Sequence, residues 1–153
     1  MHEPDTPGEL KARALRHLAR REHSRAELER KLAPHAESPA ALGQLLDALA
    51  AKKQLSDERY AEARAHQLAR KYGAARIRQD LKAKGVDDEL VGRVSAEGEA
   101  ARAAAILARK YRSPASTRME RARRMRFLLS RGFSHDTIRR VVSSADDDDA
   151  LNP

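Results

Sequence analysis

The stretch Tyr72-Gly73-Ala74-Ala75-Arg76-Ile77-Arg78-Gln79-Asp80-Leu81 decides the fold, because its pattern of residue types occurs three times in the chain. The other two copies lie at residues 23–32 and 133–142. Each copy begins with a ring residue, continues with serine or glycine, and carries aliphatic side chains at its sixth and tenth positions. The copies are about 50 to 60 residues apart, a spacing typical of a helical unit that is stacked several times. Repeats of this kind present extended surfaces to long partners and not deep catalytic pockets.

Helix signals follow one another along the chain, and no alternating strand pattern occurs. Ser24 with Glu27, and Thr117 with Glu120, have the spacing of capping boxes, in which a hydroxyl and a carboxylate satisfy backbone N–H groups. The sequence therefore predicts an all-α fold. Residues four apart share one side of a helix. We expect one such pair from each copy to face a core, namely Leu28 with Leu32, Ile77 with Leu81, and Ile138 with Val142.

Composition shifts divide the chain into three repeat modules between two terminal segments. Residues 1–8 contain two prolines and a glycine among acids, and we expect no fixed structure there. The modules are predicted at residues 9–53, 54–97 and 98–144, and the last helix is expected to end near Ser143. Four consecutive aspartates mark residues 145–153 as an acidic tail, which we also expect to lack fixed structure.

The charge balance favours a polyanionic partner. The 153 residues carry a formal net charge of +8, even with the aspartate run included, and this favours nucleic acid or an acidic protein surface. The absence of cysteine excludes disulfides and thiolate metal sites, and fits a reducing cytosol. No signal peptide or membrane-spanning run occurs, so we expect a soluble cytoplasmic protein.

Catalytic and cofactor motifs are missing from the sequence. The seven glycines never fall in a phosphate-loop or dinucleotide-binding pattern, and the six histidines are scattered without ligand spacing. No serine has a nucleophile context, and no pair of carboxylates is isolated in apolar sequence. We therefore expect no enzyme activity, no cofactor and no metal site. The aspartate run at residues 146–149 is interpreted as a solvated tail and not as a magnesium site.

Basic residues are the candidate binding residues. Arginine suits this role because its planar fork donates two parallel hydrogen bonds to a carboxylate or phosphate. The ring residues of the three copies are expected to hold turns between helices and not to stack on bases, since aromatic residues make up only 3% of the chain. The candidates are Arg21, Arg25, Arg70, Lys71, Arg76, Arg78, Lys82, Lys84, Arg123, Arg124, Arg126, Arg131, Arg139 and Arg140.

Three blocks of sequence resemble motifs of one family, in the same order. The N-terminal block is Ala14-Leu15…Leu18-Ala19-Arg20-Arg21-Glu22-His23-Ser24…Glu27-Leu28…Lys31-Leu32. The middle block begins Leu55-Ser56-Asp57-Glu58-Arg59-Tyr60-Ala61 and continues from Arg70 through the opening stretch to Lys82-Ala83-Lys84-Gly85-Val86. The last is Met125-Arg126-Phe127-Leu128…Arg131-Gly132-Phe133-Ser134…Ile138. Together they resemble the RecX family, bacterial regulators of the RecA recombinase.

The resemblance implies a tandem array of three three-helix, helix-turn-helix-like modules that form an elongated body. It also implies a monomer that binds RecA filaments on single-stranded DNA and inhibits the recombinase, ATPase and co-protease activities of RecA. Weak direct binding to DNA is compatible with it. Two alternatives stay open at this point: a stand-alone helix-turn-helix DNA-binding protein, and an ordinary helical adaptor, which explains the repeats but not the order of the three blocks.

Overall fold

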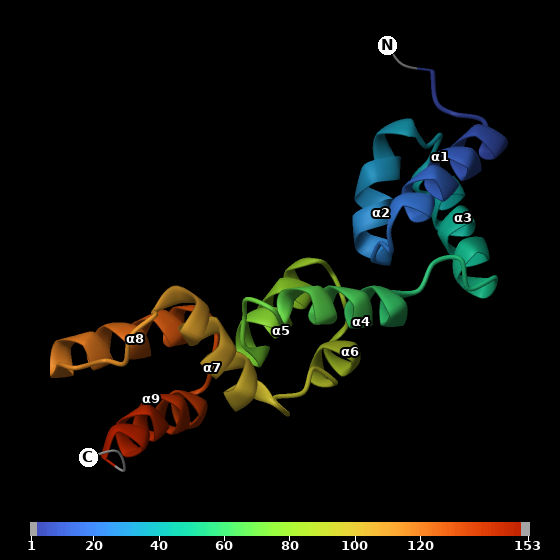
Figure 1. The fold of residues 1–153 in the computed structure, drawn as a ribbon. Helices are drawn as coiled ribbons and strands as arrows, with labels where there is room; N and C mark the ends of the chain where they lie inside the picture. The colour runs from blue at the N-terminus through green and yellow to red at the C-terminus, as the bar shows by residue number, and fades with distance from the viewer. Residues whose placement is uncertain (1–2, 151–153) are drawn as a thin grey trace. The chain divides into compact units, whose positions relative to one another are not determined.

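Helices form all the regular structure in the described part of this chain. The computed structural model describes the backbone of residues 3–150 and the side chains of residues 3–142, and it contains no strand within those bounds. Figure 1 shows the helices in chain order: α1 (Pro7–Arg20), α2 (Arg25–Leu32), the 3₁₀ turn η1 (Ala33–His35), α3 (Pro39–Ala51), α4 (Asp57–Leu68), α5 (Ala74–Ala83), α6 (Asp88–Gly92), α7 (Glu99–Lys110), α8 (Arg118–Ser130) and α9 (His135–Ala150). The all-α prediction is confirmed.

Contacts between these helices define two compact units. One unit comprises Met1–Arg64 with Leu81–Gly92, and the other comprises Ala65–Asp80 with Arg93–Pro153. Helices α1 to α3 therefore belong to the first unit and α7 to α9 to the second. Helices α4 and α5 each contribute one part to either unit.

A leucine-rich core holds the first unit together. Leu10 and Ala14 of α1 pack with Leu28 and Leu32 of α2 and with leucines of α3. Leu28 and Leu32 are fully buried, which confirms the facing predicted for this pair. Full burial of a leucine side chain contributes roughly 1.5–3 kcal/mol. The short α2 depends on this packing, because an isolated helix of eight residues is marginal in water.

The second unit has its own core around Phe133. Ala103 and Ile106 of α7 meet Leu128 of α8 and the apolar side of α9. Ile138 and Val142 lie in this cluster, and Ile77 and Leu81 of α5 are buried as well, so the predicted facing of all three pairs is confirmed.

The prediction for the N-terminal segment was wrong for the described residues. Thr6 forms a reciprocal capping box with Glu9, and Pro7 occupies the first turn of α1. Asp5 also accepts a hydrogen bond from Arg13, and its backbone N–H donates to the carbonyl of His35. Proline at the start of a helix has no N–H to leave unpaired, so the residues interpreted as a loop signal begin a helix. Residues 1–2 lie outside the described residues.

Helix α9 is longer than the sequence predicted. It continues to Ala150 and does not end near Ser143. No glycine or proline occurs between Ser143 and Asn152 to stop it. The remainder of the predicted tail, residues 151–153, lies outside the described residues.

The two predicted capping boxes are formed only in part. The hydroxyls of Ser24 and Thr117 accept from the backbone N–H groups of Glu27 and Glu120, as expected. Neither carboxylate completes the box, because Glu27 pairs with Arg21 and Glu120 accepts from the N–H and hydroxyl of Ser116. The hydrogen bonds from Ser116 hold the pKa of Glu120 below its usual range.

The start of α2 is joined to the next module at what we call the first junction, within the first unit. The Ser24 hydroxyl donates to the Lys84 carbonyl at 2.7 Å, and the Arg25 N–H donates to an Asp57 carboxylate oxygen at 2.7 Å. Gly85 follows α5 with φ +82°, and a Cβ on it would lie 2.4 Å from the Cβ of Ala26. Glycine is required here both by the left-handed backbone and by the close approach.

An equivalent set of contacts, the second junction, joins the start of α5 to the module that follows it, within the second unit. The Gly73 N–H donates to the Arg131 carbonyl at 2.8 Å, and the Ala74 N–H donates to a Glu99 carboxylate oxygen at 3.0 Å. Gly132 follows α8 with φ +88°, and its Cβ would lie 2.4 Å from the Cβ of Arg76. Helix α5 at the first junction thus corresponds to α8 at the second.

Candidate anion-binding groove

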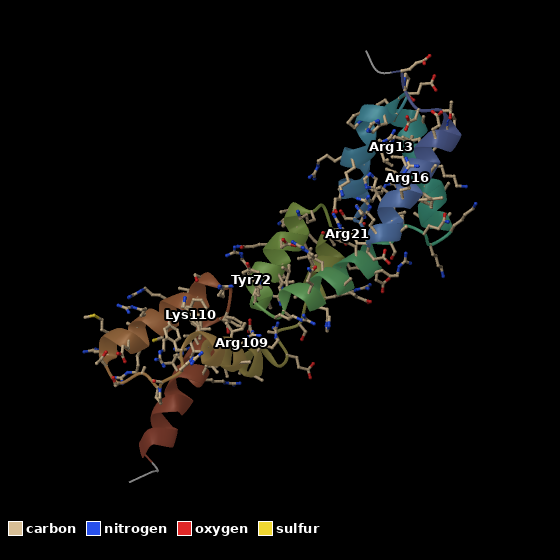
Figure 2. The ribbon with its side chains drawn as sticks, turned by 45° about the horizontal axis from the view of Figure 1, so that its top comes forward. Arg13, Arg16, Arg21, Tyr72, Arg109 and Lys110 are labelled. Carbon is tan, nitrogen blue, oxygen red and sulfur yellow. The ribbon has the colours of Figure 1, made fainter. Side chains whose placement is uncertain are left out.

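A basic hollow of about 610 Å³ lies in the second unit. It is lined by Arg70, Lys71, Tyr72, Ile106, Arg109, Lys110, Phe127 and Arg131, and we call it the basic groove. Tyr72, Arg109 and Lys110 are labelled in Figure 2. Positive side chains predominate in this lining, and no carboxylate belongs to it.

The ends of three helices place these side chains. Arg70 and Lys71 follow the last residue of α4, Arg109 and Lys110 end α7, and Arg131 caps α8. Each helix end carries a partial negative charge of roughly half a unit on its carbonyl groups. Arg109 donates to the Arg70 carbonyl at 2.8 Å, so part of its positive charge offsets the partial negative charge at the end of α4. The five positive side chains outweigh the three partial negative charges of the helix ends, so the groove keeps a net positive charge.

Aromatic rings separate neighbouring cations in this region, and we call the arrangement the cation–aromatic ladder. Its members in order are Arg76, Tyr72, Arg131, Phe127, Lys110, Tyr111 and Arg124. The Arg131 guanidinium carbon lies 5.4 Å from the Tyr72 ring centroid and 5.1 Å from that of Phe127. The Lys110 ammonium lies 3.9 Å from the Phe127 centroid. Each contact contributes about 0.5–1 kcal/mol at an exposed site. Rings therefore hold these cations in place and leave their charge unneutralised.

The structure brings only some of the predicted binding residues to the groove. Arg70, Lys71 and Arg131 line it. Arg76 and Arg124 belong to the ladder and also donate to backbone carbonyls, of Ser130 and Ser113 respectively.

Four other candidates have structural partners. Arg21 pairs with Glu27 at 2.6 Å, and Arg25 pairs with Asp47 at 2.7 Å. Arg78 donates to the Val94 carbonyl at 2.7 Å, and Arg139 pairs with Asp136 one turn before it. The remaining candidates point into solvent or are half-buried, and their side chains make no hydrogen bond or ion pair with other described residues: Lys82, Lys84, Arg123, Arg126 and Arg140.

Sequence reasoning missed Arg109 and Lys110, although a signal for them exists. The pentapeptide Leu68-Ala69-Arg70-Lys71-Tyr72 occurs again as Leu107-Ala108-Arg109-Lys110-Tyr111. Both copies end a first helix of a module, α4 in one case and α7 in the other. The two copies of the pentapeptide occupy the same position in their modules, and together they supply four of the five cations of the groove.

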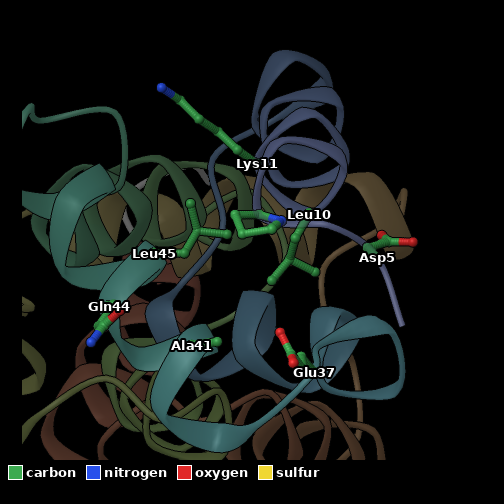
Figure 3. Close-up of a pocket in the computed structure, with 8 residues that line it drawn as sticks. Asp5, Leu10, Lys11, Glu37, Ala41, Gln44 and Leu45 are labelled. Carbon is green, nitrogen blue, oxygen red and sulfur yellow. The ribbon is translucent and has the colours of Figure 1, made fainter. Parts of the chain in front are cut away.

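A second hollow, of about 290 Å³, lies in the first unit between α1 and α3. Figure 3 shows Leu10 and Leu45 among the lining residues, while the ammonium end of Lys11 extends away from them. Asp5 and Glu37 stand at its edge. The hydrogen bond from Arg13 holds the pKa of Asp5 below its usual range, so this carboxylate is ionised and paired with Arg13. This hollow, with Lys11 as its one cation and otherwise mostly apolar, does not suit a polyanion.

The described residues contain neither a metal-ion cluster nor a membrane-spanning helix. No group of three or more histidine or acidic side chains is placed to hold a metal ion there. Among the described helices, none has the length and apolar character needed to cross a membrane.

The fold and the groove define a class, the helical repeat proteins that present a basic surface. The chain belongs to the RecX family within it. Models of the first, second and third RecX three-helix domains match residues 11–42, 56–94 and 97–142. The predicted family and the three three-helix repeats are confirmed.

Named relatives resemble the chain over nearly its whole length. The regulatory protein RecX of Ralstonia nicotianae is 47% identical over 146 residues, which cover 94% of this chain and 92% of the relative. That of Herbaspirillum seropedicae is 44% identical and covers 95% and 98%. The crystal structure of RecX from Lactobacillus salivarius matches with a TM-score of 0.80 over 92% of this chain and 96% of that one. At 22% identity, this last match shows the fold. The chain thus belongs to a family of regulatory proteins.

Proposed function

We propose that this protein regulates the RecA recombinase by binding RecA filaments on single-stranded DNA. Binding inhibits the recombinase, ATPase and co-protease activities of RecA, and so modulates DNA repair, recombination and the SOS response. Membership of a family of regulatory proteins supports a regulator. The observation that carries the choice of a polyanionic filament is the basic groove, whose cations have no carboxylate among the lining residues.

The chemistry of the groove suits such a partner. A nucleoprotein filament offers phosphates and acidic side chains together, and arginine binds both through two parallel hydrogen bonds. Arg70 and Lys71 are exposed, and their side chains form no ion pair with other described residues. They can meet a partner without first breaking a contact of the protein. We further propose a cytoplasmic monomer without a cofactor.

Titration into a RecA reaction tests the proposal. The protein is added to RecA, ATP and single-stranded DNA, and the DNA-dependent ATPase rate is measured. Affinity is compared in parallel on the filament and on bare DNA. We expect inhibition and a strong preference for the filament, with weak binding to bare DNA that falls as salt rises. Equal affinity for bare duplex, with sequence preference and no effect on the ATPase, would instead support the stand-alone DNA-binding protein.

A matched pair of variants locates the surface. Arg70→Glu with Lys71→Glu reverses two groove charges, and Arg30→Glu with Lys52→Glu makes the same change on exposed residues of the first unit. Loss of charge complementarity in the groove should weaken filament binding by about tenfold or more. The first-unit variant should keep its affinity. Equal losses in both variants would mean that net charge, and not the groove, governs binding.

A further inference from the structure

His23 is a buried titratable ring at the first junction. Its exposed fraction is 1%, and both ring nitrogens have a partner. Nδ1 lies 3.0 Å from the Arg21 carbonyl oxygen, and Nε2 lies 2.9 Å from the Lys31 ammonium. A lysine ammonium can only donate, so Nε2 must accept, and the ring proton must be on Nδ1. The contacts therefore select the neutral ring.

The charges around His23 oppose a second proton. Lys31 of α2 and Arg21 after α1 are cationic, and the His17 ring of α1 lies with its centroid 5.6 Å away. Glu27 of α2 acts in the other direction, but Arg21 already pairs with it at 2.6 Å. The groups that face His17 are also cationic, namely Arg13, Arg20 and Lys31.

We propose that protonation of His23 releases the first junction, whereas the second junction, which has Tyr72 at the equivalent position, stays closed. A proton on Nε2 would place two donors 2.9 Å apart, so His23 and Lys31 would have to separate. Ser24 is the next residue, and its hydroxyl holds both the Lys84 carbonyl and the Glu27 N–H. Movement of His23 therefore acts on the bonds that join α2 to the following module.

The ionisation equilibria agree with this geometry. Burial, followed by the Arg21 and Lys31 charges, lowers the pKa of His23 below its usual 6.5, although the Arg21 carbonyl and Glu27 oppose the shift. Burial and the Lys31 charge also lower the pKa of His17.

These shifts fix the sign of the pH dependence. The released state binds protons more readily than the closed state, so closure is favoured above pH 6.5 and is lost as the pH falls below it. Burial raises the pKa of Glu27, but the Arg21 hydrogen bond and charge outweigh it and leave the pKa below 4.5. The contribution of Glu27 is therefore lost only in stronger acid. The histidine response can be measured separately above that range.

Hydrogen exchange and histidine titration on the full chain test the proposal. The readouts are the amides of Arg25 and Glu27 at the first junction and of Gly73 and Ala74 at the second. After correction for intrinsic exchange, the first pair should lose protection between about pH 7 and about pH 5, by up to about tenfold per pH unit for each proton. The second pair should not respond.

Variants assign the response to this ring. His23→Gln retains a donor and an acceptor without a titrating ring and should abolish the acid response, whereas His66→Gln changes an exposed histidine of α4 and should keep it. Nuclear magnetic resonance titration of the native chain needs no variant and should give His23 a pKa below 6.5. A His23 titration at or above 6.5, equal acid loss at both junctions, or an undiminished response in a folded His23→Gln protein would overturn the proposal.

Discussion

The two junctions perform the same task with different chemical groups. In each, a carboxylate from the first helix of the following module accepts from an N–H at the start of a second helix, and a positive-φ glycine ends the opposing helix. The first junction uses the side chain of Ser24 to reach the opposing carbonyl, while the second uses the backbone of Gly73. Mutation can remove the Ser24 side chain without moving the backbone. The Gly73 contact instead requires two backbone segments to approach each other closely.

The burial of the carboxylate is the second difference between them. Glu99 is 4% exposed, and its other oxygen accepts from the Thr137 hydroxyl at 3.1 Å, so it links α5, α7 and α9. Asp57 is only half-buried. Removing the partner of a buried polar group costs more free energy of folding than removing that of an exposed one, because water cannot replace the partner. We therefore expect the carboxylate of the second junction to be more sensitive to mutation than the carboxylate of the first.

Gly73→Ala should have the largest effect. Its Cβ would lie 2.4 Å from the Gly132 carbonyl oxygen and 2.7 Å from the Phe133 nitrogen, and both are backbone atoms that cannot rotate away. We expect a loss of about 3 kcal/mol in the free energy of unfolding, measured by urea denaturation. Gly43→Ala in α3 is the control, because its Cβ would meet no atom within 4 Å beyond the adjacent backbone of its own helix, and alanine favours a helix. A loss below about 0.5 kcal/mol at Gly73 would contradict the backbone contact.

Glu99→Ala should rank next and should cost more than Asp57→Ala. The Glu99 variant leaves the Ala74 N–H buried and unpaired, which costs about 2–3 kcal/mol. At Asp57 water can reach the Arg25 N–H, and the loss should be about 1 kcal/mol, typical of a helix cap. Thermal unfolding of both variants measures the order. Equal losses would remove burial as the difference between the junctions.

Ser24→Ala should weaken the first junction by about 2 kcal/mol, because Ser24 is fully buried and its loss leaves the Glu27 N–H without a partner. It removes the hydroxyl that caps α2 and donates to the Lys84 carbonyl. Hydrogen exchange at Glu27 should quicken, while exchange at Gly73 and Ala74 stays unchanged. Faster exchange at both junctions would show that they do not respond separately.

Arg25→Ala should have the smallest effect. The variant keeps the backbone N–H that donates to Asp57 and loses only the ion pair with Asp47, whose side chain is 72% exposed. Such pairs contribute about 0–1 kcal/mol, and the small difference should shrink further in high salt. A large loss would mean that the ion pair, and not the backbone contact, holds this end of α2.

Local signals explain what could be predicted from the sequence. Helix caps and four-residue spacing depend on near neighbours, so the all-α fold and the buried pairs such as Ile77 and Leu81 were predicted correctly. The sequence showed the repeat, but it did not show which helix of a module each copy forms. The third copy covers the start of α9, the third helix of a module, whereas the other two copies cover α2 and most of α5, which are second helices. The predicted bounds of the three modules stay a prediction.

The groove was harder to predict because it depends on contacts between distant residues. Arg76, Arg78 and Arg124 looked like equivalent surface cations, but each donates to a carbonyl 11 to 54 residues away. Such pairing leaves no pattern in the sequence. Only Arg70, Lys71 and Arg131 of the candidates line the groove. The repeated pentapeptide that ends in Tyr72 and Tyr111 would have added the other two cations.

The cation–aromatic ladder also contains tyrosines whose intrinsic fluorescence can report on it. The chain has no tryptophan and three tyrosines, of which Tyr72 and Tyr111 belong to the ladder and Tyr60 is buried in the first unit. Two of the three phenol rings therefore report on the ladder. An anion that draws Arg131 or Lys110 away from these rings changes the emission of Tyr72 and Tyr111, whereas an event confined to the first unit acts on Tyr60. Occupancy of the groove can thus be followed in the unlabelled protein.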